Sequence, residues 1–474
     1  MDISLLPEEL FEEIALYLDI SDVLSCCLVN SRWRNAMNKN RIWFNLCSKR
    51  FSVNMQNLDM IKSPCLVDPP FTPPKQNCYS LSETCPWKLR FMQEAHVMRN
   101  WRFGRFMSHV ITKTINPLCL ECDEDVIVIS SMEKREFTTW TIESSPIQVQ
   151  TTPFSLWHVI SDFFKLSGDK LVVVQCTLLQ VFVKNMNNRN AFDLTYRFLF
   201  NKSEEESSNI PSTDDISDWY NNNIGLYPSD LNTVCDHNGD YFVGLVQEGN
   251  MNKVIFHIWD INTGHKVGEQ LIPQVDDLVT DVHFSLHSSD LHILMKLRDS
   301  IKERTTIFCF SLDTFKYTNL HIKFDYVVPI VLFGEKFLLN TDVSGRNIWL
   351  WKNEDGEFIH KLCCNFDIQP TSLQFVLSFV IFAGNSDCMG NVMVFDTKTL
   401  KTTCEFVTDY RVTNLLFIRS ELILVGGWMQ LGIWELSTAT KLHTLDFQDC
   451  LWINQYKTKT IVENDDDLFL LHFW

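Results

Sequence analysis

Cys119 and Cys122 have the spacing of metal-ligating or redox-active cysteine pairs. A zinc site built on such a pair needs further ligands, and neither a second pair of this kind nor two nearby histidines accompanies it. Both cysteines fall on a predicted inner β-strand, where small apolar side chains pack well. We therefore interpret them as core residues and expect neither a metal site nor a cofactor.

Other catalytic patterns are absent from the sequence. The thirteen histidines form no HExxH or HxH cluster, and no GxxxxGK[ST], GxGxxG or GxSxG motif occurs. The usual signatures of nucleotide-binding enzymes and serine hydrolases are therefore missing. A catalytic triad assembled from distant loops leaves no local pattern and stays open as an alternative. We predict a protein that is not an enzyme.

Charge and composition restrict the partners. The 474-residue chain has a formal net charge of −18, which repels phosphate backbones and argues against nucleic acid. No apolar run approaches the ~18 residues of a membrane span. The start, MDISLLPEEL, lacks the basic residues of a signal peptide. We expect no membrane association, and sixteen reduced cysteines in the cytoplasm, the nucleus or both.

Residues 1–47 are expected to form short helices. Leu6, Leu10, Ile14 and Leu18 recur at every fourth position and make one apolar stripe, with Pro7 at the expected first helical position. Ser21 and Ser31 are predicted to cap a second and a third helix, and Asn40 is predicted to start a fourth. About 45 residues make a marginal core, so this module is expected to pack against something else.

Residues 48–101 are predicted to connect this module to the rest of the chain. Prolines in 51–83, among them PPFTPP, favour an extended, semi-rigid segment. A helix is expected from about Pro86 to Asn100. One face of it carries Trp87, Phe91, Ala95, Met98 and, just beyond, Trp101.

From residue 102 to 474 a short strand that ends in an aromatic residue recurs at intervals of 42, 77, 51, 41, 44, 39 and 40 residues. A period near forty is typical of β-propeller blades, with four strands in each. The longest interval contains an acidic insertion at about 201–222. We predict eight blades, with seven as the alternative. The repeated aromatic positions are Trp140, Phe182, Trp259, Phe310, Trp351, Phe395, Trp434 and Trp474.

The predicted ring needs one outer strand from outside the repeats. Residues 103–112 follow the connector helix directly and are expected to supply that strand to the last blade, whose inner strands end at Trp474. Closure of this kind removes free sheet edges. The predicted fold class is therefore α plus all-β: a helical module, a connector helix and a closed β-propeller.

The first 47 residues resemble the F-box. The family opens with Leu-Pro, continues with spaced aliphatic residues, and ends with a Val-x-x-x-Trp-Arg segment, here Val29–Arg34, and a later tryptophan. The resemblance implies docking on a Skp-type adaptor. Several matching residues must also form the module's own core, and sequence alone does not divide them. The implied docking residues are Leu6, Pro7, Leu10, Ile14, Leu18, Val23, Leu24, Val29, Trp33 and Trp43.

The rest of the chain resembles F-box proteins that carry WD-repeat propellers. Trp87-Lys88 and the segment Arg99–Gly104 match the connector of such proteins, and Ile258–Gly264, IWDINTG, is the best copy of the repeat. The Gly-His dipeptide expected early in each blade is essentially absent, so the His-to-Asp hydrogen-bond relay of the family is not expected here.

The combined resemblance implies the substrate receptor of an SCF-type (Skp adaptor–cullin–F-box) ubiquitin ligase. The propeller would hold a target protein near the ubiquitin-conjugating enzyme, and so raise the effective concentration of the target's lysines. The alternative is an adaptor or scaffold that binds the Skp partner without a cullin.

Five arginines are predicted to lie in loops that open on one propeller face. Relatives use arginines on that face to clamp phosphoserine or phosphothreonine, which a guanidinium binds bidentately. Exposed ion pairs with nearby carboxylates explain the same residues as ordinary surface, and the two explanations stay open. The residues are Arg135, Arg298, Arg304, Arg346 and Arg411.

Overall fold

The computed structural model describes residues 7–51, 84–199 and 235–473, with short gaps between strands, the longest of them residues 155–162. The chain divides into two compact units, one made of residues 1–112 and 413–474, the other of residues 113–412. Most of the proline-rich segment and the predicted acidic insertion lie outside the described residues. Within the described part, no helix is both long and apolar enough to cross a membrane.

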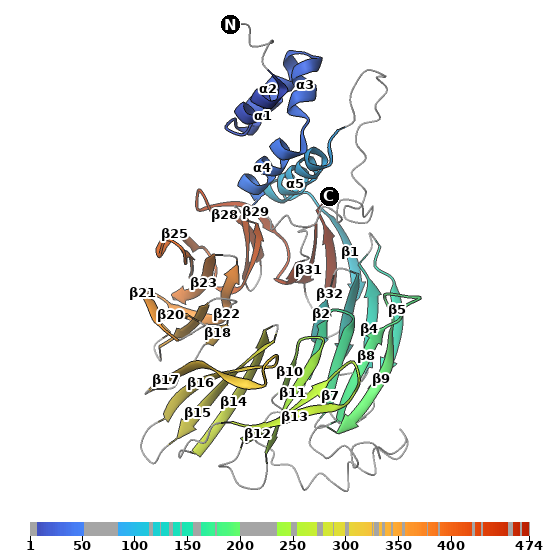
Figure 1. Cartoon of the computed structure of the whole chain (residues 1–474), viewed down its shortest axis with the longest axis vertical. Helices are drawn as coiled ribbons and strands as arrows, with labels where there is room; N and C mark the ends of the chain where they lie inside the picture. Colours follow the sequence, from blue (N-terminus) through green and yellow to red (C-terminus); the bar gives the residue numbers. More distant parts are fainter. Residues whose placement is uncertain are drawn as a thin grey trace. The chain divides into compact units, whose positions relative to one another are not determined.

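Helices form the N-terminal part of the first unit (Figure 1). They follow the predicted order, and the connector helix runs two residues beyond its expected end. The helices are α1 (Glu8–Ala15), α2 (Ile20–Val29), α3 (Ser31–Met37), α4 (Asn40–Phe51) and α5 (Pro86–Arg102).

One predicted first helical residue and two predicted capping residues differ from the structure by one or two positions. Pro7 is the N-cap residue of α1, with an extended ψ of 149°, and not its first helical residue. Asp19 caps α2 in place of Ser21, because its Oδ1 accepts hydrogen bonds from the Asp22 amide at 2.9 Å and the Ser21 hydroxyl at 2.8 Å. Asn30 caps α3 in the same way, accepting from the Trp33 amide.

Eight four-stranded antiparallel sheets follow, so the prediction of an eight-bladed β-propeller is confirmed. Three of the blades lie early in the second unit. Their strands are β2 (Pro117–Cys122), β3 (Val126–Ser131), β4 (Glu136–Thr141), β5 (Gln148–Pro153); β6 (Phe163–Ser167), β7 (Lys170–Gln175), β8 (Leu178–Lys184), β9 (Phe192–Leu199); and β10 (Cys235–His237), β11 (Tyr241–Gln247), β12 (Val254–Asp260), β13 (Lys266–Leu271).

The next three blades complete the second unit as far as residue 412. Their strands are β14 (Leu278–His287), β15 (Asp290–Arg298), β16 (Glu303–Ser311), β17 (Lys316–Phe324); β18 (Val331–Phe333), β19 (Phe337–Thr341), β20 (Asn347–Lys352), β21 (Phe358–Cys363); and β22 (Asp367–Val376), β23 (Phe379–Ser386), β24 (Met389–Asp396), β25 (Lys401–Thr408).

The last two blades belong to the first unit, except for the first residue of β26. The final sheet has the order β1-β32-β31-β30, with Met107 of β1 opposite His472 of β32. Of the segment 103–112 that was predicted to supply the outer strand of the last blade, residues 107–112 form that strand. The strands are β26 (Val412–Arg419), β27 (Leu422–Gly427), β28 (Gln430–Glu435), β29 (Thr440–Leu445), β30 (Asp449–Ile453), β31 (Lys459–Asn464), β32 (Asp467–His472) and β1 (Met107–Thr112).

The repeated aromatic residues mark the same strand in successive blades. Those from Trp140 to Trp434 lie on β4, β8, β12, β16, β20, β24 and β28, which are the third strands of their sheets. Trp474, just beyond the third strand of the last blade, lies outside the described residues. The forty-residue period therefore reports one structural position per blade.

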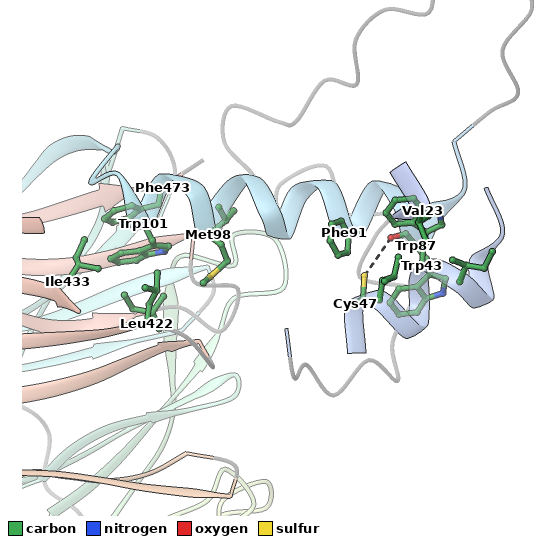
Figure 2. Packing of buried hydrophobic residues seen from close by; sticks show 14 of the residues in the cluster. Val23, Trp43, Cys47, Trp87, Phe91, Met98, Trp101, Leu422, Ile433 and Phe473 are labelled. Carbon is green, nitrogen blue, oxygen red and sulfur yellow. Dashed lines mark hydrogen bonds between the residues drawn. The ribbon is translucent and has the colours of Figure 1, made fainter. Parts of the chain in front are cut away.

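One apolar core joins the helices to the last two blades within the first unit (Figure 2). It extends from Val23 and Trp43, through Phe91 and Met98 of α5, to Trp101. There the Trp101 ring stacks on Phe473, with centroids 3.4 Å apart and an interplanar angle of 10°. The helical module thus buries part of its apolar surface against a neighbouring element, as its small size required.

A polar joint links three blades of the second unit. Asp236 on β10 accepts a charge-assisted bond from Lys165 on β6 at 2.5 Å, and its other oxygen accepts from the Leu286 amide on β14 at 2.8 Å. The buried His237 ring completes the joint, with Nε2 lying 2.9 Å from the carbonyl oxygen of Lys165. One carboxylate therefore bridges the first strands of three successive blades.

Candidate functional site

Helices α1 and α2, with the turn that follows α1, expose a set of apolar side chains. Tyr17 and Leu28 are the most exposed, at 87% and 81%, and the others are between 47% and 61% exposed. So many exposed apolar groups on two short helices are typical of an interaction surface. We call this set the docking patch; it consists of Leu10, Ile14, Tyr17, Leu24, Leu28 and Val29.

Helical periodicity separates the docking patch from the core. On α1, Leu10 and Ile14 are one turn apart and exposed, while Phe11 and Ala15 are buried. On α2, Leu24 and Leu28 stand one turn apart at the surface, next in sequence to the buried Val23 and Cys27. Each helix therefore uses one side for the core and leaves a second apolar side uncovered.

Helix α4 holds the end of α1 in place. Asn45 Nδ2 and Lys49 Nζ donate to the carbonyl oxygen of Leu16 at 3.1 and 2.9 Å, at the helix end where carbonyl groups lack partners. Arg41 Nη1 contacts Glu13 Oε1 at 2.6 Å, although both side chains are more than half exposed. These contacts fix the helix that carries part of the docking patch.

The ten docking residues that the sequence implied differ in their exposure to solvent. Pro7, Leu10, Ile14, Leu24 and Val29 are exposed. Leu18 and Trp33 are partly buried against the core, and Leu6 lies outside the described residues.

Val23 and Trp43 are core residues. Val23 is fully buried, and Trp43 Nε1 donates to the carbonyl oxygen of Met37 at 2.8 Å. The motif of the family thus combines core and surface positions, which is why sequence alone did not divide them.

Tyr17 and Leu28 belong to the patch but were not among the residues implied by sequence. Leu28 lies four residues after Leu24, so extending the apolar spacing of α2 by one turn would have found it. Tyr17 lies in the turn that follows α1, two residues beyond its last residue, Ala15.

The predicted loop arginines have different surroundings. Arg346 lies between β19 and β20, and its Nε donates to Asp367 Oδ1 at 2.8 Å. Both side chains are more than half exposed, so the pair is an ordinary surface ion pair that water and salt screen strongly. Arg411 lies between β25 and β26 and is exposed, with no carboxylate partner among the described residues.

Arg298 and Arg304 lie on strands, not in a loop, which corrects the predicted position. Pairing of β15 with β16 continues as far as Arg298 opposite Glu303, and Arg304 is the next residue of β16. Both arginines therefore lie at the ends of the second and third strands of this blade. Arg135 falls outside the described residues.

The two cysteines of the CxxC pair lie on β2, the edge strand of the first sheet of the second unit. Burial raises the pKa of Cys119 and raises that of Cys122 well above its ordinary value. Metal binding and redox attack both need the thiolate form. These surroundings favour protonated thiols that pack against their neighbours.

Comparison with known proteins bears on the helical module. Residues 3–49 match the model of the F-box-like family. The N-terminus of this chain is an F-box-like domain. The docking patch and the buried Trp43 both belong to it.

Two curated relatives match part of the chain. Both are named "Probable E3 ubiquitin ligase complex SCF subunit sconB", from Arthroderma benhamiae and Trichophyton verrucosum. Each is 23% identical over 161 residues, which cover 30% of this chain. The match spans 23% of the length of these relatives.

Solved structures similar to this chain include a computationally designed protein, Ika8, Saccharomyces cerevisiae Sqt1 and the Dos1 propeller. Ika8 and Sqt1 each have a TM-score of 0.49 and cover 77% of this chain, with 10% and 13% identity; the matches span 99% and 97% of those chains. The Dos1 propeller has a TM-score of 0.48 and 9% identity, covering 78% of this chain and 96% of that one.

Proposed function

We propose that this protein is a substrate receptor of an SCF-type ubiquitin ligase. In this proposal the F-box-like domain docks on a Skp-type adaptor, and the propeller holds a target protein for ubiquitination. The observation that carries the proposal is the docking patch, because it exposes apolar side chains on the domain that matches the F-box-like family. The partial match to relatives named as SCF subunits supports the same assignment.

The role of the chain in this proposal is positional. A target bound to the propeller is held close to the ubiquitin-conjugating enzyme, which raises the effective concentration of its lysines without any catalytic group on this chain. The continuous core along α5 supports this role, because it holds the F-box-like domain in a fixed position on the last two blades.

Adaptor binding tests the first half of the proposal. We expect Leu28→Glu to weaken binding of a purified Skp-type adaptor at least tenfold, because it places a charge in the apolar docking patch. Titration calorimetry measures the affinity. Met186→Glu is the matched control, since Met186 is 96% exposed in the turn between β8 and β9 and should leave binding unchanged. Equal affinities for wild type and Leu28→Glu would contradict docking through this patch.

We further propose that the loop arginines bind phosphate on the target, with ordinary solvated surface as the alternative explanation. The exposed Arg411 supports phosphate binding, whereas the Arg346–Asp367 pair supports the alternative. If phosphate binding is right, phosphatase treatment of the target abolishes its capture, and Arg→Ala changes on that face act together. Capture that survives dephosphorylation would leave these arginines as surface residues.

A further inference from the structure

The connector helix and the residues just after it are basic in an acidic protein. The segment from Pro86 to Arg105 contains five arginines and lysines and a single acidic residue, Glu94, whereas the whole chain has a net charge of −18. Within this segment, Glu94 is buried and pairs with Arg90. The exposed positive charge is therefore concentrated toward the end of α5.

The C-terminal cap of α5 turns the chain so that Arg105, like Arg99, lies beside the Phe103 ring. Gly104 adopts a left-handed conformation, with φ of +58°, and its amide donates to the carbonyl oxygen of Trp101 at 3.2 Å. The Arg105 amide donates to the carbonyl oxygen of Asn100 at 2.8 Å. This pair of bonds is the Schellman motif, which ends a helix and reverses the chain.

An exposed aromatic ring lies between the two arginines in sequence. Phe103 is 52% exposed, and its ring centroid lies 5.9 Å from the guanidinium carbon of Arg99 and 5.2 Å from that of Arg105. Both arginines are themselves exposed. We call these three residues the Phe103 cluster.

In the described part of the chain, carboxylates pair with other arginines of this segment and not with the cluster. Arg102, the third arginine of the segment, pairs with Glu435 Oε1 at 2.7 Å. Across the residues that the structure describes, Arg99 and Arg105 have no carboxylate partner. Two guanidinium groups beside an exposed ring thus keep their hydrogen-bonding edges available.

We propose that the Phe103 cluster binds an acidic peptide segment of a partner protein, in which an apolar side chain accompanies the carboxylates. Arginine binds carboxylates through two parallel hydrogen bonds, and arginines and aromatic residues dominate the binding energy of protein interfaces. The ring offers apolar contact to the accompanying side chain. This surface is separate from the docking patch and does not rest on the proposed ligase function.

Charge selects a peptide over a nucleic acid. A nucleic acid extends its charge along its whole length, and beyond the basic segment it meets a chain that is acidic overall. The negative charge of a short acidic peptide segment extends no further than the small basic site that binds it. The proposal therefore commits to a protein partner.

The test uses the full-length protein and a fluorescein-labelled heptapeptide in which aspartates and glutamates surround one central phenylalanine. Fluorescence anisotropy should show binding that weakens as salt is raised from low ionic strength, as expected for exposed charges. We expect R99E/R105E to weaken binding at least tenfold. Phe103→Ser should also weaken it, whereas Phe103→Tyr, which keeps the ring, should retain it.

The matched control reverses two exposed charges elsewhere. R189E/K398E makes the same change in net charge, in the β8–β9 and β24–β25 turns, and should leave peptide affinity within about twofold of wild type. If thermal melting shows that R99E/R105E unfolds, R99Q/R105Q removes the charges with smaller disturbance and takes its place.

Three outcomes would overturn the proposal. The first is no peptide binding by the wild-type protein, and the second is an equal loss in the R189E/K398E control. The third is tighter binding of a single-stranded oligonucleotide of equal charge than of the peptide, with this binding lost in R99E/R105E. The cluster would then be a nucleic-acid contact.

Discussion

Trp101 is a large side chain buried at the junction between the connector helix and the last two blades. It is fully buried, stacks on Phe473, and belongs to the same core as Leu422 and Ile433 (Figure 2). Few other side chains of α5 are both as large and as completely enclosed. The orientation of the F-box-like domain on these two blades therefore depends strongly on this residue.

Truncation of this side chain should weaken the junction. We expect Trp101→Ala to lower the free energy of unfolding of the first unit by about 3–5 kcal/mol, the usual loss for a buried aromatic residue. Denaturant unfolding measures the loss. Tyr17→Ala is the control, because Tyr17 is exposed and its removal should change stability by less than about 0.5 kcal/mol. Similar losses in both variants would contradict the packing described for Trp101.

Glu94 and Arg90 form a largely buried ion pair on α5. Glu94 Oε1 lies 2.5 Å from Arg90 Nη2, and the side chains are 4% and 13% exposed. A buried pair contributes little net stability, because desolvation offsets the attraction between the charges, but removal of one partner strands the other.

Removing one charge of the Arg90–Glu94 pair should therefore cost more stability than replacing both. We expect Glu94→Ala to destabilise the protein by about 3–5 kcal/mol, since it leaves the guanidinium of Arg90 without this partner. The double variant R90M/E94L, which replaces both charges by apolar groups, should lose clearly less. Thermal unfolding distinguishes them, and a double variant as unstable as Glu94→Ala would show that the charges themselves are needed.

At the scale of single elements, β10 contains a histidine that should make stability depend on pH. Burial lowers the pKa of His237 to about 4, and the ammonium groups of Lys165 and Lys170 act in the same direction. The hydrogen bonds agree with a neutral ring, because the Gly239 amide donates to Nδ1 at 3.3 Å while Nε2 faces a carbonyl oxygen. A protonated Nδ1 could not accept that bond.

The pKa of His237 in the folded protein is therefore below its ordinary value of 6.5. Its contribution to stability is complete above pH 6.5 and is lost as pH falls toward 4, because the unfolded chain binds the proton more readily. We expect a loss on the order of 3 kcal/mol between pH 7 and pH 4 from this group. Denaturant unfolding at several pH values should show a flatter profile for His237→Gln. Parallel profiles for both proteins would contradict this assignment.

The sequence predicted the elements better than their contacts. Recurring aromatic residues located the third strand of seven of the eight blades, because each of these blades repeats the same strand position. The sequence placed two helix caps on Ser21 and Ser31, whereas the capping residues are Asp19 and Asn30, because Asp, Asn and Ser have similar capping preferences and lie within two positions of each other here.

The candidate site was only partly predictable for a related reason. In the F-box-like domain, Val23 and Leu24 are neighbours of similar hydrophobicity, yet one is fully buried and the other is 47% exposed. Periodicity shows that two apolar faces exist, but the packing of α1 to α4 decides which one is covered. The Phe103 cluster was not predicted as a site, since Arg105 reaches the ring only through the turn at Gly104.

For the whole molecule, the F-box-like domain and the eight blades serve different parts of the proposed function. The domain offers an uncovered apolar patch on α1 and α2, and the connector helix α5 shares one core with that domain and the last two blades. A receptor that acts by positioning its target needs such continuity, because a loose joint lowers the effective concentration that it provides.

Co-purification of the full-length protein from cells tests the central claim most directly. We predict that the wild-type protein retains both a Skp-type adaptor and a cullin, and that Leu28→Glu loses the two together while Met186→Glu keeps them. Retention of the adaptor without a cullin would instead indicate a scaffold that acts outside the ligase. Recovery of neither partner with the wild-type protein would contradict the assignment as an SCF-type receptor.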